Sequence, residues 1–311
     1  INKEKEAYLK PSRDLFSHLT PAITHFKSLT PINPIIVTYV VPIYKEHHRL
    51  RPKSEDNPNG EDLIQVKIKQ LEELFSLNPR YTWRLIFIDD GDRKFKSGEI
   101  AIQELQRRFR AYFDSEQVKV FFLEDLRVGI AHLSKKGWAV VEAFRYVFSN
   151  TKVEDHDLFF YTDADISSDL RLSGSVIYEL ETGQDLVITS RWEEKSTVIN
   201  RGLKEKLRSW IYNLVVYYFL KLDYTDTQNG FKGFRANCLK TILPLSKEIG
   251  YAFDTELLML AEVKEFAIKE IPIYWVDSKP ETNIRLGKDA FEMFKALKKQ
   301  AQYKKKIIKQ I

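Results

Sequence analysis

The sequence predicts an α/β protein with a mainly parallel central sheet flanked by helices. Apolar, strand-like runs alternate with segments of helical periodicity along most of the 311 residues. Three of the apolar runs end in acidic residues, as expected where the strands of a parallel sheet end together at its ligand-binding edge. The hydrophobic content of 43% is that of a globular chain long enough to bury a large core.

Composition restricts the environment and the partners of the chain. Cys238 is the only cysteine, so no intrachain disulfide can form. No run approaches the roughly 20 apolar residues needed to span a bilayer, and no secretory signal is visible. The net charge of +5, with both signs mixed along the chain, argues against a nucleic-acid partner. We expect a cytoplasmic protein that can lie peripherally at the cytoplasmic face of a membrane.

The first elements follow from composition and periodicity. Residues 1–33 mix apolar residues with prolines and predict a helical lead-in to the main domain. The β-branched run at 35–41 predicts a strand that Pro42 ends. Apolar residues at helical spacing predict a helix over 63–77, and the apolar run at 83–88 predicts the second strand.

The same alternation continues towards the middle of the chain. Helical spacing predicts a helix over 99–113, followed by a third strand at 118–123. A further helix over 138–148 precedes the central strand, 158–162. This order of strands and helices favours a parallel sheet covered on both faces.

The second half is less regular. We expect a strand at 185–190, a polar loop at 226–234, a helix over 253–266 and a proline-bearing edge strand over 267–276. The long helix predicted over 203–222 has an aromatic centre, which is typical of a core helix and also of a helix at a membrane interface. The predicted domains are the lead-in, a main domain with halves 34–165 and 166–285, and a basic C-terminal helix at 286–311.

Two carboxylates directly follow the strand at 158–162. Asp163 and Asp165 are two residues apart, so in extended backbone they point to the same side. Together they can hold one hard cation, of the kind that bridges substrate phosphates. The alternative is a surface turn with two acids.

Other acids and a lysine are expected near the same edge. Glu46, Asp89 and Asp90 lie just beyond the first two strands, where they can bind a ligand or cap the following helices. Lys136 precedes the helix at 138–148, where it can meet a phosphate or remain a solvated surface lysine.

The ordered set of motifs over residues 35–280 resembles an inverting family 2 glycosyltransferase of the GT-A fold. Within that family the chain is most similar to the dolichyl-phosphate glucosyltransferase and mannosyltransferase group. The motifs are Val41-Pro42-Ile43-Tyr44-Lys45-Glu46, Ile88-Asp89-Asp90-Gly91, Lys136-Gly137, Asp163-Ala164-Asp165, Ser190-Arg191, Asp226-Thr227-Gln228-Asn229-Gly230-Phe231-Lys232-Gly233-Phe234, Phe253-Asp254-Thr255-Glu256-Leu257-Leu258 and Ser278-Lys279.

The resemblance implies the roles of the site residues. The residues implied to bind the donor are Pro42, Tyr44, Glu46, Asp89, Asp90, Lys136, Asp163, Ala164 and Asp165. Those implied to bind the acceptor are Arg191, Arg201, Gln228 and Lys279. Asp165, Arg191 and Asp254 are the expected catalytic residues, and Asp163 and Asp165 the ligands of Mg²⁺ or Mn²⁺.

The implied reaction moves a hexose from a nucleotide sugar to a polyprenyl phosphate, with a membrane surface as a further partner. The motif at 226–232 favours UDP-glucose over GDP-mannose as the donor. One alternative is a family 2 enzyme whose acceptor is a hydroxyl of a soluble sugar or protein. The other is a catalytically inactive relative that only binds, against which the intact Asp163, Asp165 and Arg191 argue.

Overall fold

A computed structural model describes residues 12–91, 96–126, 136–277 and 288–310 of the chain. Its strands are β1 (Ile35–Ile43), β2 (Tyr81–Asp89), β3 (Val118–Phe122), β4 (Leu158–Thr162), β5 (Leu186–Ser190), β6 (Thr197–Ile199), β7 (Phe231–Arg235), β8 (Ile268–Pro272) and β9 (Tyr274–Val276). The longer helices are α2 (Arg13–Ser28), α3 (Leu63–Phe75), α4 (Ser97–Arg108), α7 (Lys136–Asn150), α8 (Ser173–Glu181), α9 (Leu203–Leu220), α11 (Phe253–Val263) and α12 (Lys288–Ile308). Shorter helical segments are α5 (Arg110–Asp114), α6 (Leu123–Leu126), η2 (Leu170–Leu172), α10 (Ala236–Ile242) and η3 (Leu243–Leu245).

Seven of the strands form one sheet in the order β3-β2-β1-β4-β7-β5-β8. The first four strands are parallel, and β8 is parallel to β5, whereas β7 runs antiparallel to both of its neighbours. The strands β1, β2 and β4 therefore end at one edge, as the sequence predicts for a site built from distant segments. A separate two-stranded parallel sheet joins β6 to β9.

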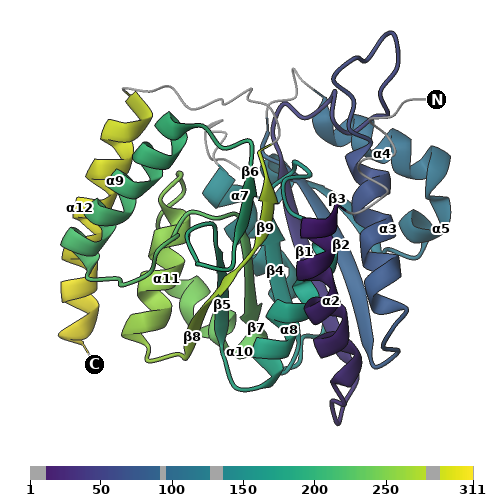
Figure 1. Cartoon of the computed structure of the whole chain (residues 1–311). Coiled ribbons are helices and arrows are strands. Elements are labelled where there is room, and N and C mark those ends of the chain that lie inside the picture. Colours follow the sequence, from purple (N-terminus) through teal and green to yellow (C-terminus); the bar gives the residue numbers. More distant parts are fainter. Residues whose placement is uncertain (1–11, 92–95, 127–135, 278–287, 311) are drawn as a thin grey trace.

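Helices cover both faces of the sheet (Figure 1). Side chains alternate along β1, so that Val37 and Tyr39 pack with α2, α3 and α8 while Val40 packs with α7 and α11 on the other face. This double burial explains why the parallel strands are almost continuously apolar in sequence. The predicted α/β class with a mainly parallel sheet is confirmed.

Several predicted elements were wrong. Residues 226–234 are not all loop, because β7 begins at Phe231 and lies inside the sheet. Gly233 occurs there because an added Cβ would come within 2.5 Å of Val176. The strand predicted at 267–276 is two strands, of which β8 is indeed at the sheet edge, and the helix predicted at 99–113 breaks at Phe109 into α4 and α5.

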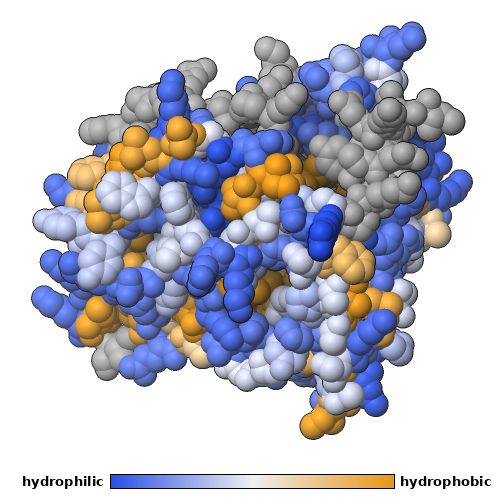
Figure 2. All heavy atoms as spheres, in the orientation of Figure 1, coloured by the Kyte–Doolittle hydropathy of each residue, from blue (hydrophilic) through white to orange (hydrophobic). Residues whose placement is uncertain are grey.

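The aromatic helix α9 is not a core helix. Its buried residues are only Val216 and Leu220, and it packs along α12 at one side of the molecule (Figure 1). Pale and orange side chains gather over this region on the face seen in Figure 2. The exposed large residues of α9 are Leu203, Leu207, Trp210, Ile211, Leu214, Tyr217 and Tyr218. Among the described helices, none has the length and apolar character required to cross a membrane.

Candidate functional site

The two carboxylates that follow β4 are fixed by the backbone around them. The Asp163 amide donates to the Gly230 carbonyl at 3.2 Å, and the Ser167 amide donates to the Asp165 carboxylate at 3.2 Å. A Cβ at position 230 would lie 2.2 Å from the Asp163 carboxylate, so only glycine lets this side chain adopt its position. Ala164 between the two acids is 6% exposed and packs in the core.

The two acids suit a divalent cation that also binds a substrate. Among the described residues, no three His, Cys, Asp or Glu side chains are arranged to hold a metal ion by themselves. However, the Asp163 side chain is 43% exposed and forms an ion pair with the Lys136 ammonium, so a cation already lies against it. Two carboxylates with substrate phosphates are an ordinary oxygen ligand set for Mg²⁺, and the residues present therefore fit such an ion.

Glu46 lies within electrostatic range of the same pair. Burial raises the pKa of Glu46 to about 7, Arg49 opposes the shift, and Asp165 and Asp163 add to it. The Arg49 guanidinium lies 3.5 Å from the Glu46 carboxylate. The loop after β1 thus reaches the acids after β4, as the parallel sheet predicts. Of the neighbouring donor candidates, Pro42 is buried in β1 and Tyr44 is half-buried.

Asp89 and Asp90, at the end of β2, are both buried. The Asp89 carboxylate accepts from the Gly98 amide at 2.6 Å and from the Gly91 amide at 3.3 Å. Asp89 therefore holds the first turn of α4, which is the helix-cap role that the sequence left open. Asp90 is 4% exposed beside it.

Arg191, expected to bind the acceptor, forms a two-bonded ion pair. Its guanidinium donates to both carboxylate oxygens of Asp226, at 2.7 and 2.8 Å, and it stacks 5.1 Å from the centre of the Trp275 ring. Asp226 is fully buried. Although burial alone favours the neutral acid, the attraction of Arg191 holds the pKa of Asp226 below its usual value.

Arg201 is the more available cation of the two. Its guanidinium lies 5.3 Å from the centre of the Trp192 ring, and no carboxylate within the described residues forms an ion pair with it. Burial, followed by the charge of Arg191, lowers the pKa of Arg201 to about 10. A phosphate dianion would relieve this repulsion. Of the other acceptor candidates, Gln228 is half-buried, and Lys279 lies outside the described residues.

Asp254 is part of a buried polar cluster. The Lys232 ammonium donates to the Asp254 carboxylate at 2.8 Å, to the Tyr161 hydroxyl at 2.8 Å and to the Asn229 carbonyl at 2.6 Å. Burial raises the pKa of Asp254 well above its usual value and lowers that of Lys232 to about 7. The pair is neutral overall wherever the shared proton resides, so it adds no net charge to the core.

Sequence reasoning missed three residues of this region. Lys232 and Asp226 were quoted only as parts of a motif, yet they are the buried partners of Asp254 and Arg191. Lys67 was not singled out, yet it contacts the backbone of both Asp163 and Asp165. A lysine within the apolar stripe of a predicted helix was the signal that could have identified it.

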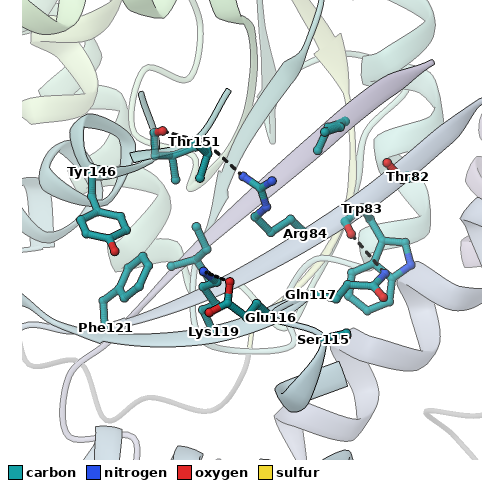
Figure 3. Close-up of a pocket in the computed structure, with 13 residues that line it drawn as sticks. Thr82, Trp83, Arg84, Ser115, Glu116, Gln117, Lys119, Phe121, Tyr146 and Thr151 are labelled. Atoms are coloured by element: carbon teal, nitrogen blue, oxygen red, sulfur yellow. Dashed lines mark hydrogen bonds and ion pairs between the residues drawn. The ribbon is translucent and has the colours of Figure 1, made fainter. Parts of the chain in front are cut away.

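A hollow of about 270 Å³ lies away from these residues (Figure 3). Its lining includes Ile36, Thr82 and Arg84, which lie at the beginnings of β1 and β2. The hollow is therefore at the opposite edge of the sheet from the acids. Its Arg84 donates to the Thr151 hydroxyl at 3.4 Å. The hollow contains none of the predicted site residues.

The chain is similar to proteins that are named glycosyltransferases. No protein-family model matches the chain. It is 26% identical over 258 residues to glycosyltransferase AglD of Haloferax volcanii, covering 83% of this chain but 35% of AglD. It is also 26% identical over 276 residues to dolichyl-phosphate beta-glucosyltransferase of Saccharomyces cerevisiae, covering 85% and 73% of the two chains. The chain thus spans only about a third of the length of AglD.

Solved structures show the fold. Glucosyl-3-phosphoglycerate synthase from Mycobacterium tuberculosis, in complex with Mn²⁺, UDP and phosphoglyceric acid, aligns with a TM-score of 0.56 at 14% identity, over 91% of this chain and 82% of that one. The chain has the GT-A fold, and the resemblance expected from its motifs is confirmed by homologues that are named glycosyltransferases.

Proposed function

We propose that the chain is an inverting, metal-dependent glycosyltransferase that moves glucose from UDP-glucose to a polyprenyl phosphate. The observation that carries the proposal is the carboxylate pair Asp163 and Asp165 at the end of β4, with Arg191 and Arg201 following β5. The names of the yeast glucosyltransferase and of the undecaprenyl-phosphate mannosyltransferase of Micrococcus luteus, 28% identical over 158 residues, support a lipid-phosphate acceptor.

The reaction is a single displacement. An oxygen of the acceptor phosphate attacks the anomeric carbon, and the bond from that carbon to the diphosphate breaks with its electron pair leaving on UDP. Mg²⁺ or Mn²⁺, held by Asp163 and Asp165, would neutralise charge on the leaving diphosphate. The Lys136 ammonium forms an ion pair with Asp163. From this position it can also contact the leaving diphosphate and stabilise its charge.

The basic residues bring the second anion close. Arg201 binds the acceptor phosphate because its guanidinium has no carboxylate partner among the described residues. Arg191, paired with Asp226, adds positive charge and fixes the segment that leads to Arg201. No base is needed, because a phosphate monoester with a second pKa of roughly 6 is already ionised near neutral pH.

The buried state of Asp254 supports this acceptor over a hydroxyl. A hydroxyl acceptor needs a base to take its proton, and a base must reach it. Asp254 is instead 4% exposed and bonded to Lys232.

A donor and acceptor panel tests the proposal. The protein is incubated with UDP-glucose or GDP-mannose, with a short polyprenyl phosphate or a soluble sugar. We expect a glucosylated lipid from UDP-glucose in Mg²⁺ or Mn²⁺, and none in excess EDTA. Transfer from GDP-mannose would reverse the assignment of the donor, and transfer only to the sugar would establish a hydroxyl acceptor.

We further propose that α9 and the lysines of α12 hold the enzyme at an anionic membrane surface. Exposed Trp and Tyr side chains are favoured in the headgroup region. The exposed lysines of α12 include Lys298, Lys299, Lys305 and Lys306. Lys304 of the same helix instead donates to the Leu220 carbonyl at 2.7 Å and joins α12 to α9.

Flotation with vesicles measures this contact. The wild-type protein should float with phosphatidylserine vesicles, less so in high salt, because each lysine near the surface contributes about 1 kcal/mol. Trp210→Ala with Tyr218→Ala should reduce the bound fraction strongly. The control is Phe16→Ala, since Phe16 is 61% exposed on α2, away from this surface. Equal flotation of all three proteins would remove α9 from the contact.

A further inference from the structure

Lys67 is a buried lysine directly beneath the acidic turn. It lies on α3 among Leu63, Ile64, Ile68 and Leu71, all fully buried, and is itself 1% exposed. Its ammonium donates to the Asp163 carbonyl at 3.0 Å and to the Asp165 carbonyl at 3.1 Å. The lysine therefore contacts both residues of the carboxylate pair through their backbone and not through their side chains.

A lysine in such a place requires compensation. Burial lowers the pKa of Lys67, and the charges of Asp165, Asp163 and Glu61 oppose that shift. An ammonium without partners in the core would be strongly destabilising, and one that is bonded to two carbonyls is not. The contact is thus the reason that a lysine can occupy a position that helical spacing assigns to an apolar side chain.

The contact also fixes the shape of the turn. One nitrogen bonded to carbonyls two residues apart sets the backbone between them, and this backbone determines where both carboxylates point. On the opposite side, the Gly230 carbonyl accepts from the Asp163 amide. The turn is therefore clamped between α3 and the residue preceding β7.

We propose that Lys67 is a positioning residue that orients Asp163 and Asp165 for the divalent ion. The inference rests on the metal dependence proposed above. The positioning role differs from a purely electrostatic role, in which the positive charge of Lys67 only offsets the negative charges of Asp163 and Asp165. The two roles predict opposite results, because removing a nearby positive charge would strengthen cation binding, whereas releasing the turn weakens it.

Direct Mn²⁺ binding separates the two roles. Mn²⁺ is titrated into the protein with saturating UDP and followed by electron paramagnetic resonance, and UDP affinity in EDTA is measured by calorimetry. In Lys67→Met, which keeps the length of the side chain without its donors, we expect Mn²⁺ affinity to fall about tenfold or more, as is typical when groups that orient metal ligands are removed. UDP affinity in EDTA should be unchanged.

The matched control is Lys69→Met, which removes the same charge from the exposed side of α3 and should leave Mn²⁺ affinity as in the wild type. Lys67→Gln, whose amide retains donors on a shorter side chain, should bind Mn²⁺ with an affinity between those of wild type and Lys67→Met. Should the Met variant not fold, weaker binding by the Gln variant supports the proposal.

Equal or tighter Mn²⁺ binding by the folded Lys67 variants overturns the positioning role. A wild-type protein that binds UDP but no Mn²⁺ would instead overturn the proposed metal dependence, and the role of Lys67 with it. Loss of UDP affinity in EDTA by Lys67→Met would show general damage to the site and would likewise overturn the proposal.

Discussion

Replacing Asp165 by Asn should lower glucosyl transfer about 10³-fold, as for the loss of one strong electrostatic contribution to a transition state. The amide keeps the shape of the side chain and can still accept from the Ser167 amide. It removes one of the two negative charges that we propose attract a divalent ion. Transfer rate is measured with radiolabelled UDP-glucose, and the fold is checked by thermal unfolding.

A surface acid provides the control for this change. The Asp155 side chain is 71% exposed and lies 3.5 Å from the Lys240 ammonium. It precedes β4, whereas Asp165 follows the other end of that strand. Asp155→Asn should transfer at the wild-type rate. Near-normal transfer by Asp165→Asn would refute the assigned role of the carboxylate.

Replacing Arg191 by Ala should lower the free energy of unfolding by about 3–5 kcal/mol, because the Asp226 carboxylate would remain buried and unpaired. Asp226 is fully buried, and its carboxylate faces the Arg191 guanidinium through two bonds. Chemical denaturation of the folded variant measures this loss. The acceptor KM should also rise, while UDP affinity is retained.

Stability and acceptor binding can be separated with a second substitution. Arg191→Met with Asp226→Asn removes both charges, so most of the lost stability should return while the acceptor KM remains high. Because the folded pKa of Asp226 lies below its unfolded value, the pair stabilises the wild type above the unfolded pKa. That contribution is lost as pH falls through the folded pKa, and the double variant should lack this acid-dependent part. A single Arg191→Ala of wild-type stability would contradict the buried pair.

The parallel part of the fold could be predicted because its physical signals are local. Most residues of β1, β2 and β4 are buried, so their sequences are mainly apolar, and acids follow or end these strands. The strand β7 could not be predicted in this way. It contains Lys232 and Gly233, which are unfavourable in an isolated strand and become suitable only against Asp254 and Val176.

The site residues likewise include some that local sequence signals identify and others that depend on tertiary contacts. The side chains of Asp163, Glu46 and Arg191 follow strand ends and could be identified from the order of the chain. The burial of Asp254 with Lys232, and the contact of Lys67 with two carbonyls, depend on tertiary packing that joins distant segments. The aromatic centre of α9 was ambiguous, because the same residues suit a core or a lipid interface until exposure is known.

The antiparallel strand β7 has a consequence for how the chain is made. In the described sheet, β5 joins β4 only through β7, which is synthesised after β5 and after the whole of α9. During synthesis, β5 therefore cannot pair with β7 until Phe231–Arg235 has left the ribosome. Pairing between segments distant in sequence is slow, and an unpaired strand edge is prone to association with other chains. The nascent chain is thus open to such association from the emergence of β5 until β7 has also emerged, and a chaperone would be of use in this interval.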